Sequence, residues 1–212
     1  VGQPVRAELE HVTTTGAFEF LGLERDVPVL FIIGGSLGAQ IINNCVLEAL
    51  PELVKKYQVI HQTGRTNYDG VLQASQVILE DNDFAGRYRP MSFLTPLQMR
   101  MAGGAAKLVI SRAGSAIFEI AGWGIPSIII PITSSNNDHQ RKNAYNYARA
   151  DACSVIEEAN LTPGVLSAEI DRIVEDPVLH MQMREAATRF YIPGSADKIA
   201  EKIIEIGLSH EA

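Results

Sequence analysis

The stretch VLFIIGGSLGA, residues 29–39, decides how this chain folds. Five apolar residues run without interruption from Val29 to Ile33, and a glycine-rich turn follows them directly. A short apolar run closed by glycines is typical of a strand that is buried on both faces. Apolar side chains then recur at three- and four-residue steps from Ile41 to Leu53, which predicts a helix after the turn. The stretch is therefore a strand–loop–helix unit.

The same unit recurs along the chain. Further strands are predicted at residues 57–61, 88–93, 107–111, 126–131 and 152–156. Helices are predicted at residues 41–53, 68–79, 96–102, 116–123, 139–150, 163–175, 177–189 and 195–208. Thr95 and Pro96 are typical of a helix start, and Gly124 is typical of a helix end. Apolar strands separated by helices predict an α/β fold, a doubly wound six-stranded parallel sheet of the Rossmann-like type.

Composition excludes several classes of protein. The chain has 212 residues, of which 46% are hydrophobic and 20% charged, so it can form a core and is neither disordered nor fibrous. Lys and Arg number 18 against 25 Asp and Glu, which gives a net charge of −7. An acidic chain lacks the basic face that nucleic acids require, so no nucleic-acid partner is expected. A small anion remains a candidate ligand, because backbone N–H groups can bind it locally.

The chain carries no sign of a disulfide framework or of a membrane span. Cys45 and Cys153 lie far apart and are predicted to be core thiols in a reducing compartment. The longest apolar runs, such as residues 126–132, are far shorter than the ~20 residues that cross a bilayer. The chain has no signal peptide and begins with Val1 rather than Met, so we expect it to be a fragment or a processed product.

Two glycine-containing loops follow strands of the predicted sheet and are candidate anion sites. The first, GGSLGA at residues 34–39, lacks the spacing of the dinucleotide fingerprint and the Lys-Ser/Thr of a P-loop. The second, SRAGS at residues 111–115, also opens a helix, and Arg112 adds a bidentate donor. Two helix N-termini can converge on one anion, phosphate above all. Each loop taken alone is equally consistent with a turn that only permits tight packing.

Other polar residues lie near these loops. Glu119 follows Ser115 by four residues, so it lies on the same helix face and can accept hydrogen bonds from ribose hydroxyls. Judged alone, Glu119 is more simply interpreted as a first-turn acid that favours the helix dipole. The run NNDHQRKNA, residues 136–144, opens a helix at the end of the fifth predicted strand. Its amide and imidazole groups can read sugar hydroxyls, although such a run is often only an N-cap and a solvated face.

The motifs taken together resemble one family. They are GQPVR at 2–6, GGSLGA at 34–39, HQTG at 61–64, SRAGS at 111–115 with Glu119, GIP at 124–126, and NDHQ at 137–140 with Asn143 and Ala144. This set, in this order, resembles the C-terminal half of the MurG-type transferases from Val1 to about Ala200. These are inverting enzymes of the GT-B fold. They transfer N-acetylglucosamine from UDP-GlcNAc to the muramyl sugar of an undecaprenyl-pyrophosphate lipid in peptidoglycan synthesis.

The resemblance implies a donor site on this chain. Arg6 would approach the phosphates from the linker, and the backbone at Phe93 and Leu94 would read uracil. Glu119 would hold the ribose hydroxyls. With Arg112 from the second loop, the candidate substrate-binding residues are Arg6, Gly34, Gly35, Ser36, Phe93, Leu94, Arg112, Ser115, Ala116, Glu119, His139 and Gln140.

Within that site the remaining residues would have distinct tasks. The glycines and Ser36 would line the pyrophosphate side, the amides of Ser115 and Ala116 would face the phosphates, and His139 with Gln140 would bind the GlcNAc hydroxyls. The loop between Gly114 and Glu119 is one residue shorter than is usual in the family. No metal and no cofactor are expected, because helix N-termini and arginines would neutralise the diphosphate.

The resemblance also implies what the chain lacks. Residues 1–26 are predicted to be an interdomain linker with a lead-in helix, and residues 27–212 to be the UDP-sugar domain. The family's N-terminal domain, which nothing here matches, carries the acceptor site, the membrane-docking surface and the general base. No catalytic residue is therefore expected on this chain, which alone should be inactive. The full-length enzyme would be cytoplasmic and peripheral at the inner face of the membrane.

Three alternatives remain open. The chain could belong to a GT-B transferase with another acceptor, to a UDP-sugar epimerase of the same architecture, or to a two-chain transferase as its nucleotide-sugar-binding subunit. An NAD-binding module is disfavoured, because HQTG at residues 61–64 lacks the acid that would hold the ribose.

Overall fold

The computed structural model describes residues 2–34, 39–133 and 138–210 of the chain. Its centre is a parallel sheet of six strands in the order β3-β2-β1-β4-β5-β6. The strands are β1 (Val29–Ile33), β2 (Gln58–Gln62), β3 (Tyr88–Met91), β4 (Ala106–Ser111), β5 (Ser127–Ile129) and β6 (Cys153–Val155). All five neighbouring pairs are parallel, which confirms the predicted doubly wound sheet. The strand order reverses between β1 and β4, where ligands of such sheets bind.

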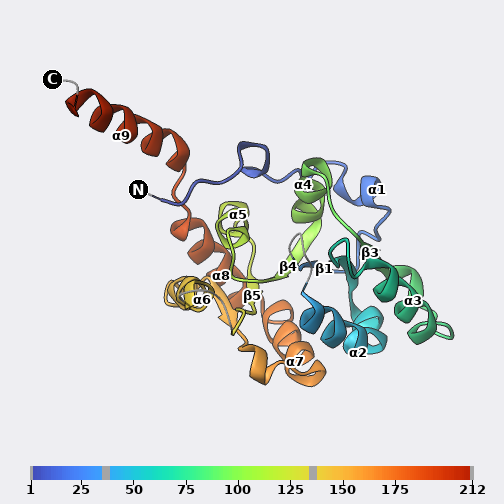
Figure 1. The fold of residues 1–212 in the computed structure, drawn as a ribbon. Helices are drawn as coiled ribbons and strands as arrows, with labels where there is room; N and C mark the ends of the chain where they lie inside the picture. The colour runs from blue at the N-terminus through green and yellow to red at the C-terminus, as the bar shows by residue number, and fades with distance from the viewer. Residues whose placement is uncertain (1, 35–38, 134–137, 211–212) are drawn as a thin grey trace.

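Helices cover both faces of this sheet (Figure 1). The helices of the body are α1 (Ala17–Leu21), α2 (Gln40–Lys56), α3 (Tyr68–Ile78), α4 (Pro96–Ala105), α5 (Ala116–Trp123), α6 (His139–Ala148), α7 (Pro163–Val174) and α8 (Pro177–Phe190). Side chains of β1 alternate between two cores. Leu30 and Ile32 pack with α2 and α7, whereas Phe31 and Ile33 pack with α4 and α5. Both faces are buried, and this is why the strand sequence is apolar throughout.

The helix ends follow the predicted chemistry. Thr95 caps α4: its hydroxyl accepts from the backbone N–H of Gln98, and the Gln98 side-chain oxygen accepts from the backbone N–H of Thr95. Pro96 lies in the first turn. Gly124 ends α5 with φ of 62°, a left-handed conformation that favours glycine. These predictions are confirmed. Strand β3 ends at Met91 rather than at Phe93, and the predicted fifth and sixth strands are shorter at both ends than expected.

The N-terminal residues are packed against the body of the domain. They form a 3-10 helix at Ala7–Leu9 before α1, and Leu9 is fully buried, with its carbonyl oxygen accepting from the Trp123 indole Nε1 at 2.7 Å. Further along the same segment, Gly104 in α4 permits the close approach of Thr13, because a Cβ at position 104 would lie 2.0 Å from the Thr13 carbonyl oxygen. The packing brings Arg6 to the same end of the sheet as α5. The assignment of residues 1–26 as an interdomain linker remains a prediction.

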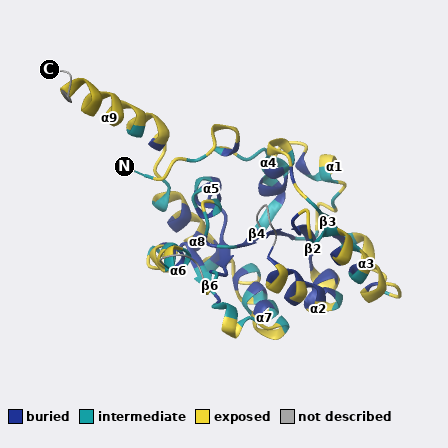
Figure 2. Cartoon of the chain, in the orientation of Figure 1, coloured by how far each residue is buried: buried dark blue, intermediate teal, exposed yellow. Residues whose placement is uncertain are grey.

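The last helix differs from the rest of the molecule. Helix α9 (Ser195–His210) extends away from the body, and nearly all of its surface is exposed (Figures 1 and 2). Its exposed apolar residues include Ile203, Ile204 and Leu208. None of the described helices combines the length and the apolar character needed to cross a bilayer.

Both cysteines lie in the core. Cys45 and Cys153 are free and buried, as predicted. Burial raises the pKa of the Cys45 thiol to about 11 and that of Cys153 to about 12. Both thiols are therefore protonated at neutral pH and are unreactive.

Candidate functional site

A cavity of about 240 Å³ lies at the carboxyl ends of the central strands. Its described lining comes from β1, β2, the loop after β3, α4, the start of α5 and the N-terminal segment: Arg6, Ile33, Gln62, Phe93, Leu94, Met99, Ser115, Ala116 and Glu119. The strand order reverses between β1 and β4, so the fold itself places the cavity where ligands of open α/β sheets bind. The structure thus brings together six of the predicted site residues.

An ion pair dominates the electrostatics of this cavity. The Arg6 guanidinium donates from Nε to Oε1 of Glu119 at 2.8 Å and from Nη2 to Oε2 at 3.0 Å. The Glu119 side chain is buried whereas that of Arg6 is exposed. The hydrogen bonds to Glu119 raise the pKa of Arg6 further above its ordinary value. The sequence pointed to both residues but not to their contact, which joins side chains 113 positions apart in the chain.

The start of α5 contributes amide groups beside this pair. Ser115 precedes the helix with αR backbone angles, and its hydroxyl makes no capping hydrogen bond. The first amides of a helix have no acceptor within it. Ser115 and Ala116 line the cavity, so this helix N-terminus faces into it with its partial positive charge. The arrangement is suited to an anion.

Phe93, Leu94 and Met99 add apolar side chains to the lining of the cavity. Leu94 is buried there, and Phe93 is partly exposed. The Arg65 guanidinium lies over the Phe93 ring, 4.8 Å from its centre. Outside helices and strands, no backbone hydrogen bond in the described part of the chain involves Leu94. A planar ligand could therefore pack on Phe93 and bond to this backbone. Arg65 was missed because a cation on an aromatic ring leaves no mark in the sequence.

The glycine-rich loop is only partly described. Gly34 is buried, and its amide donates to the Gln62 carbonyl oxygen at 3.1 Å, so this amide continues the sheet rather than facing a ligand. Gly35 and Ser36 lie outside the described residues. Gln62, at the end of β2, lines the cavity and was not among the predicted site residues. The sequence signal that could have identified Gln62 was its position at the end of an apolar strand.

A saturated polar network lies behind the loop. His61 is fully buried in β2, and its Nε2 lies 3.0 Å from Asn43 Oδ1 while its Nδ1 lies 2.9 Å from the Tyr88 hydroxyl. Asn43 in turn donates to the Thr63 carbonyl oxygen at 3.0 Å. Since Asn43 Oδ1 can only accept, Nε2 carries the proton and Nδ1 accepts from the tyrosine. Burial lowers the pKa of His61 to about 3, so the ring is neutral.

Arg112 has a different position from the one that the sequence predicts. Its Nη2 lies 2.6 Å from Oε1 of Glu158, and its Nη1 donates to the Ile130 carbonyl oxygen at 3.1 Å. Both side chains of the ion pair are largely buried. Arg112 does not line the cavity and instead ties the loop after β4 to the segment after β6.

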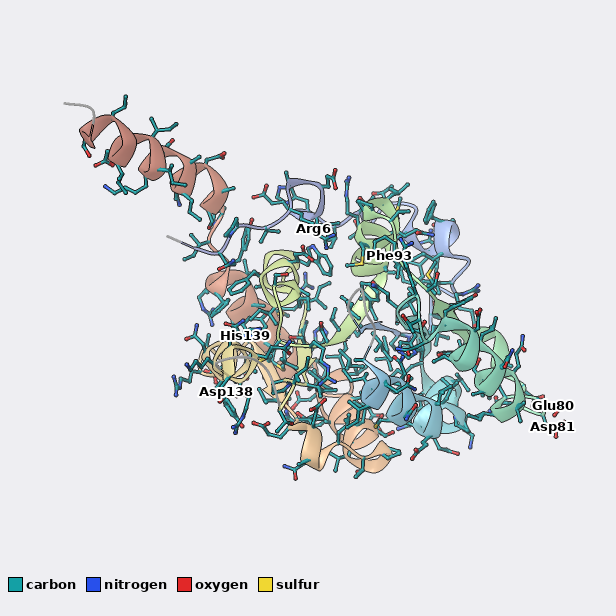
Figure 3. The ribbon with its side chains drawn as sticks, viewed as in Figure 1. Arg6, Glu80, Asp81, Phe93, Asp138 and His139 are labelled. Atoms are coloured by element: carbon teal, nitrogen blue, oxygen red, sulfur yellow. The ribbon has the colours of Figure 1, made fainter. Side chains whose placement is uncertain are left out.

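The two residues expected to bind the sugar lie apart from Arg6 and Phe93. His139 and Gln140 open α6 and are not among the described residues that line the cavity. Figure 3 shows His139 beside Asp138 at the start of α6, away from Arg6 and Phe93. The Gln140 Oε1 accepts from the Ile132 amide at 3.2 Å. Residues 134–137, directly before them, lie outside the described part of the chain.

Chemically, the cavity combines a helix N-terminus for an anion, a buried carboxylate for hydroxyl groups and an aromatic wall for a planar group. Among the described residues, no three His, Cys, Asp or Glu side chains gather as metal ligands would. A larger cavity of about 650 Å³ lies away from the strand ends, beside Gly2, Phe118 and Phe190. Its described polar lining residues are Gln3, Asn146, Arg189 and Tyr191, with no carboxylate among them. The smaller cavity, at the carboxyl ends of the strands, is the better candidate.

Comparison with known proteins adds independent information. The family described as glycosyltransferase family 28 C-terminal domain matches residues 29–201. A relative from Levilactobacillus brevis, named UDP-N-acetylglucosamine–N-acetylmuramyl-(pentapeptide) pyrophosphoryl-undecaprenol N-acetylglucosamine transferase, is 34% identical over 205 residues. That match covers 95% of this chain and 54% of the relative, so the chain spans about half the length of the curated relatives that it matches.

Solved structures agree on the fold. MurG of Acinetobacter baumannii superposes with a TM-score of 0.72 at 22% identity, over 97% of this chain and 56% of that one. UDP-GlcNAc 2-epimerase from Neisseria meningitidis, solved bound to UDP-GlcNAc, superposes with a TM-score of 0.63 at 14% identity, over 91% and 47% of the two chains. The fold is the Rossmann-like C-terminal half of a GT-B glycosyltransferase, as predicted. Since the family match covers most of its length, the chain belongs to the glycosyltransferase family 28 C-terminal domains.

Proposed function

We propose that this chain is the donor-binding half of an inverting hexosyltransferase of peptidoglycan synthesis. The donor would be UDP-GlcNAc, and the acceptor the muramyl-pentapeptide lipid that the names of its relatives specify. The observation that carries the proposal is the gathering of Arg6, Phe93, Glu119 and the N-terminus of α5 around one cavity at the carboxyl edge. A nucleoside diphosphate has the three chemical parts that these groups match.

Each part of the donor has a proposed partner. The uracil ring would pack against Phe93 and bond to the backbone at Leu94, and the ribose hydroxyls would donate to Glu119. The diphosphate would lie at the amides of Ser115 and Ala116, with Arg6 beside it. This chain would then orient the sugar and stabilise the departing UDP, because fixed amide dipoles and a guanidinium match the charge that develops on the leaving group. His139 and Gln140 stay proposed sugar contacts.

The rest of the reaction lies outside these residues. The general base, the acceptor site and the membrane contact are proposed for a further domain, because the matched relatives are about twice as long as this chain. The protein would then be cytoplasmic and peripheral to the membrane. The alternative is that the partner half is a separate chain. Co-expression with the N-terminal half of the Levilactobacillus brevis relative, followed by an assay for GlcNAc transfer, tests whether two chains can complete the enzyme.

Calorimetric titration of the chain with UDP, CDP and ADP tests the proposal. We expect UDP to bind most tightly, because only uracil presents the matching edge to the backbone at Leu94. UDP-GlcNAc should also bind, and EDTA should leave both affinities unchanged. Equal affinity for the three nucleotides would remove the uracil assignment, and the absence of any binding would contradict a donor site in this cavity.

A further inference from the structure

The ion pair in the cavity is built asymmetrically. Both oxygens of the Glu119 carboxylate accept from the fork of Arg6, at 2.8 and 3.0 Å. The Glu119 side chain is only 6% exposed, whereas that of Arg6 is 57% exposed. The acceptor is thus fixed in the wall of the cavity, and the donor reaches it from the rim. A ribose diol that approaches this carboxylate meets the guanidinium already bound to it.

The backbone of Arg6 is held while its side chain can turn. The Arg6 carbonyl oxygen accepts from the Leu9 amide at 2.8 Å, and Leu9 is buried under Trp123. In the part of the chain that the structure describes, the Arg6 side chain has hydrogen bonds to Glu119 alone. An ion pair with one solvated partner is weakly stabilising, so little opposes its opening. Because Glu119 lines the cavity, its carboxylate can accept hydrogen bonds from water or from a ligand when Arg6 leaves.

From this asymmetry we infer that Arg6 is a specificity-determining residue that guards Glu119 against ribosides without a phosphate. The inference rests on the proposed function, since it takes Glu119 as the ribose ligand. A nucleoside has to break the ion pair and leaves Arg6 with water alone. A nucleoside diphosphate exchanges partners: its ribose hydroxyls satisfy Glu119, and its phosphate oxygens accept the guanidinium fork. A nucleoside only replaces the two bonds of the ion pair with two from its ribose, whereas a nucleoside diphosphate adds bonds between its phosphate oxygens and the guanidinium.

The guard predicts effects of opposite sign for two ligands. Removal of the Arg6 charge frees Glu119, and the affinity for uridine rises by about three- to six-fold, since an ion pair with one solvated partner reduces the competent fraction by about that factor. The same change removes a phosphate contact, so the affinity for UDP falls by about ten-fold. A residue that only positioned Glu119 would weaken both ligands when it is removed.

The experiment titrates the wild-type chain, Arg6→Met and Arg25→Met with uridine and with UDP at pH 8. Arg25→Met is the matched control, because Arg25 forms an exposed ion pair with Glu19 outside the cavity. Arg6→Lys, which keeps the charge and loses the fork, should lie between wild type and Arg6→Met for both ligands. Melting curves confirm that each variant is folded.

The expected result is tighter uridine and weaker UDP for Arg6→Met, with both unchanged for Arg25→Met. Uridine binding that is unchanged or weaker in Arg6→Met would overturn the guard while UDP binding to wild type still supported the donor site. A wild-type chain that binds no UDP would overturn the proposed function itself, and the guard with it.

Discussion

Two arginine–glutamate pairs of this chain share one geometry and differ in their freedom. Arg87 meets Glu24 with the same bidentate fork as Arg6 and Glu119, at 2.9 and 3.1 Å. The exposure is reversed, because Arg87 is 16% exposed and Glu24 is 56% exposed. Arg87 also donates to the carbonyl oxygens of Val54 and Lys55 and lies over the Phe84 ring. The Arg87 side chain is fixed by several parts of the fold, whereas the Arg6 side chain bonds, within the described part of the chain, to the Glu119 carboxylate alone.

The difference shows how to separate a structural ion pair from one that is ready to bind a ligand. In a structural pair the arginine donates its remaining N–H groups to backbone oxygens, and its guanidinium is buried. A pair that belongs to a site keeps the acceptor in the cavity wall and the donor at the rim. Bidentate geometry alone does not separate the two, but burial and further partners do. The predictions below test whether the two pairs behave as differently as they are built.

The largest effect is expected from the carboxylate in the cavity. Glu119→Ala should weaken UDP binding by about 1.5–3 kcal/mol, roughly 10- to 150-fold, because both ribose hydroxyls lose a charged acceptor. Glu24→Ala is the matched control, since it removes the carboxylate of the other bidentate pair and should leave UDP affinity unchanged. Calorimetry measures both. Equal losses in the two variants would show that Glu119 acts only through the fold.

The buried hydrogen-bond network around His61 should make the stability of the fold, rather than ligand binding, depend on pH. The pKa of His61 is about 3 in the folded chain, below the ~6.5 of an unfolded histidine. The unfolded state therefore binds more protons than the folded state below about pH 6.5. Through this residue the free energy of unfolding falls by about 2 kcal/mol when the pH is lowered from 7 to 5. His180, whose pKa burial also lowers, adds to the slope.

Urea unfolding at several pH values measures that slope. His61→Asn should flatten it, and His11→Asn, which changes an exposed histidine, should not. His61→Asn is also expected to lower stability at pH 7, because Tyr88 and Asn43 lose a partner. An unchanged slope in His61→Asn would mean that the imidazole is reached by protons in the folded state.

The smallest expected effect separates the two arginines by stability. Arg87→Met should lower the melting temperature by roughly 2–4 °C, the shift that a loss of about 1 kcal/mol produces at this chain length. Arg6→Met should change it by less than about 1 °C, because the Arg6 side chain is solvated and bonds, among the described residues, to Glu119 alone. In a UDP titration the order should be reversed, with the larger loss of affinity in Arg6→Met and the smaller in Arg87→Met. A larger melting shift for Arg6→Met would contradict the comparison.

The sequence was enough to predict the fold because its signals are local. Uninterrupted apolar runs such as residues 29–33 identify buried parallel strands, and Thr95, Pro96 and Gly124 mark helix ends through their own backbone preferences. The edge of the sheet that carries the cavity followed from the strand–loop–helix order. Its polar residues near α5 were candidates from the loop pattern and spacing, and Phe93 with Leu94 were predicted by the family resemblance.

What the sequence could not supply are pairings between distant side chains. Nothing local indicates that Arg6 reaches Glu119 or that Arg112 turns to Glu158, since both contacts depend on how loops pack after the sheet has formed. Gln62 was noted within the HQTG motif but was not assigned to the site, because an amide at a strand end has many uses. Arg65 escaped notice because its partner is an aromatic face.

The central claim is that the cavity bounded by Arg6 and Glu119 is the nucleotide site. A crystal structure of the chain with UDP tests it most directly. We predict that the ribose hydroxyls lie within hydrogen-bond distance of the Glu119 carboxylate and that Arg6 is turned to the phosphates, with Arg87 still paired to Glu24. Arg6 still bidentate on Glu119, with UDP bound elsewhere on the chain, would contradict the claim.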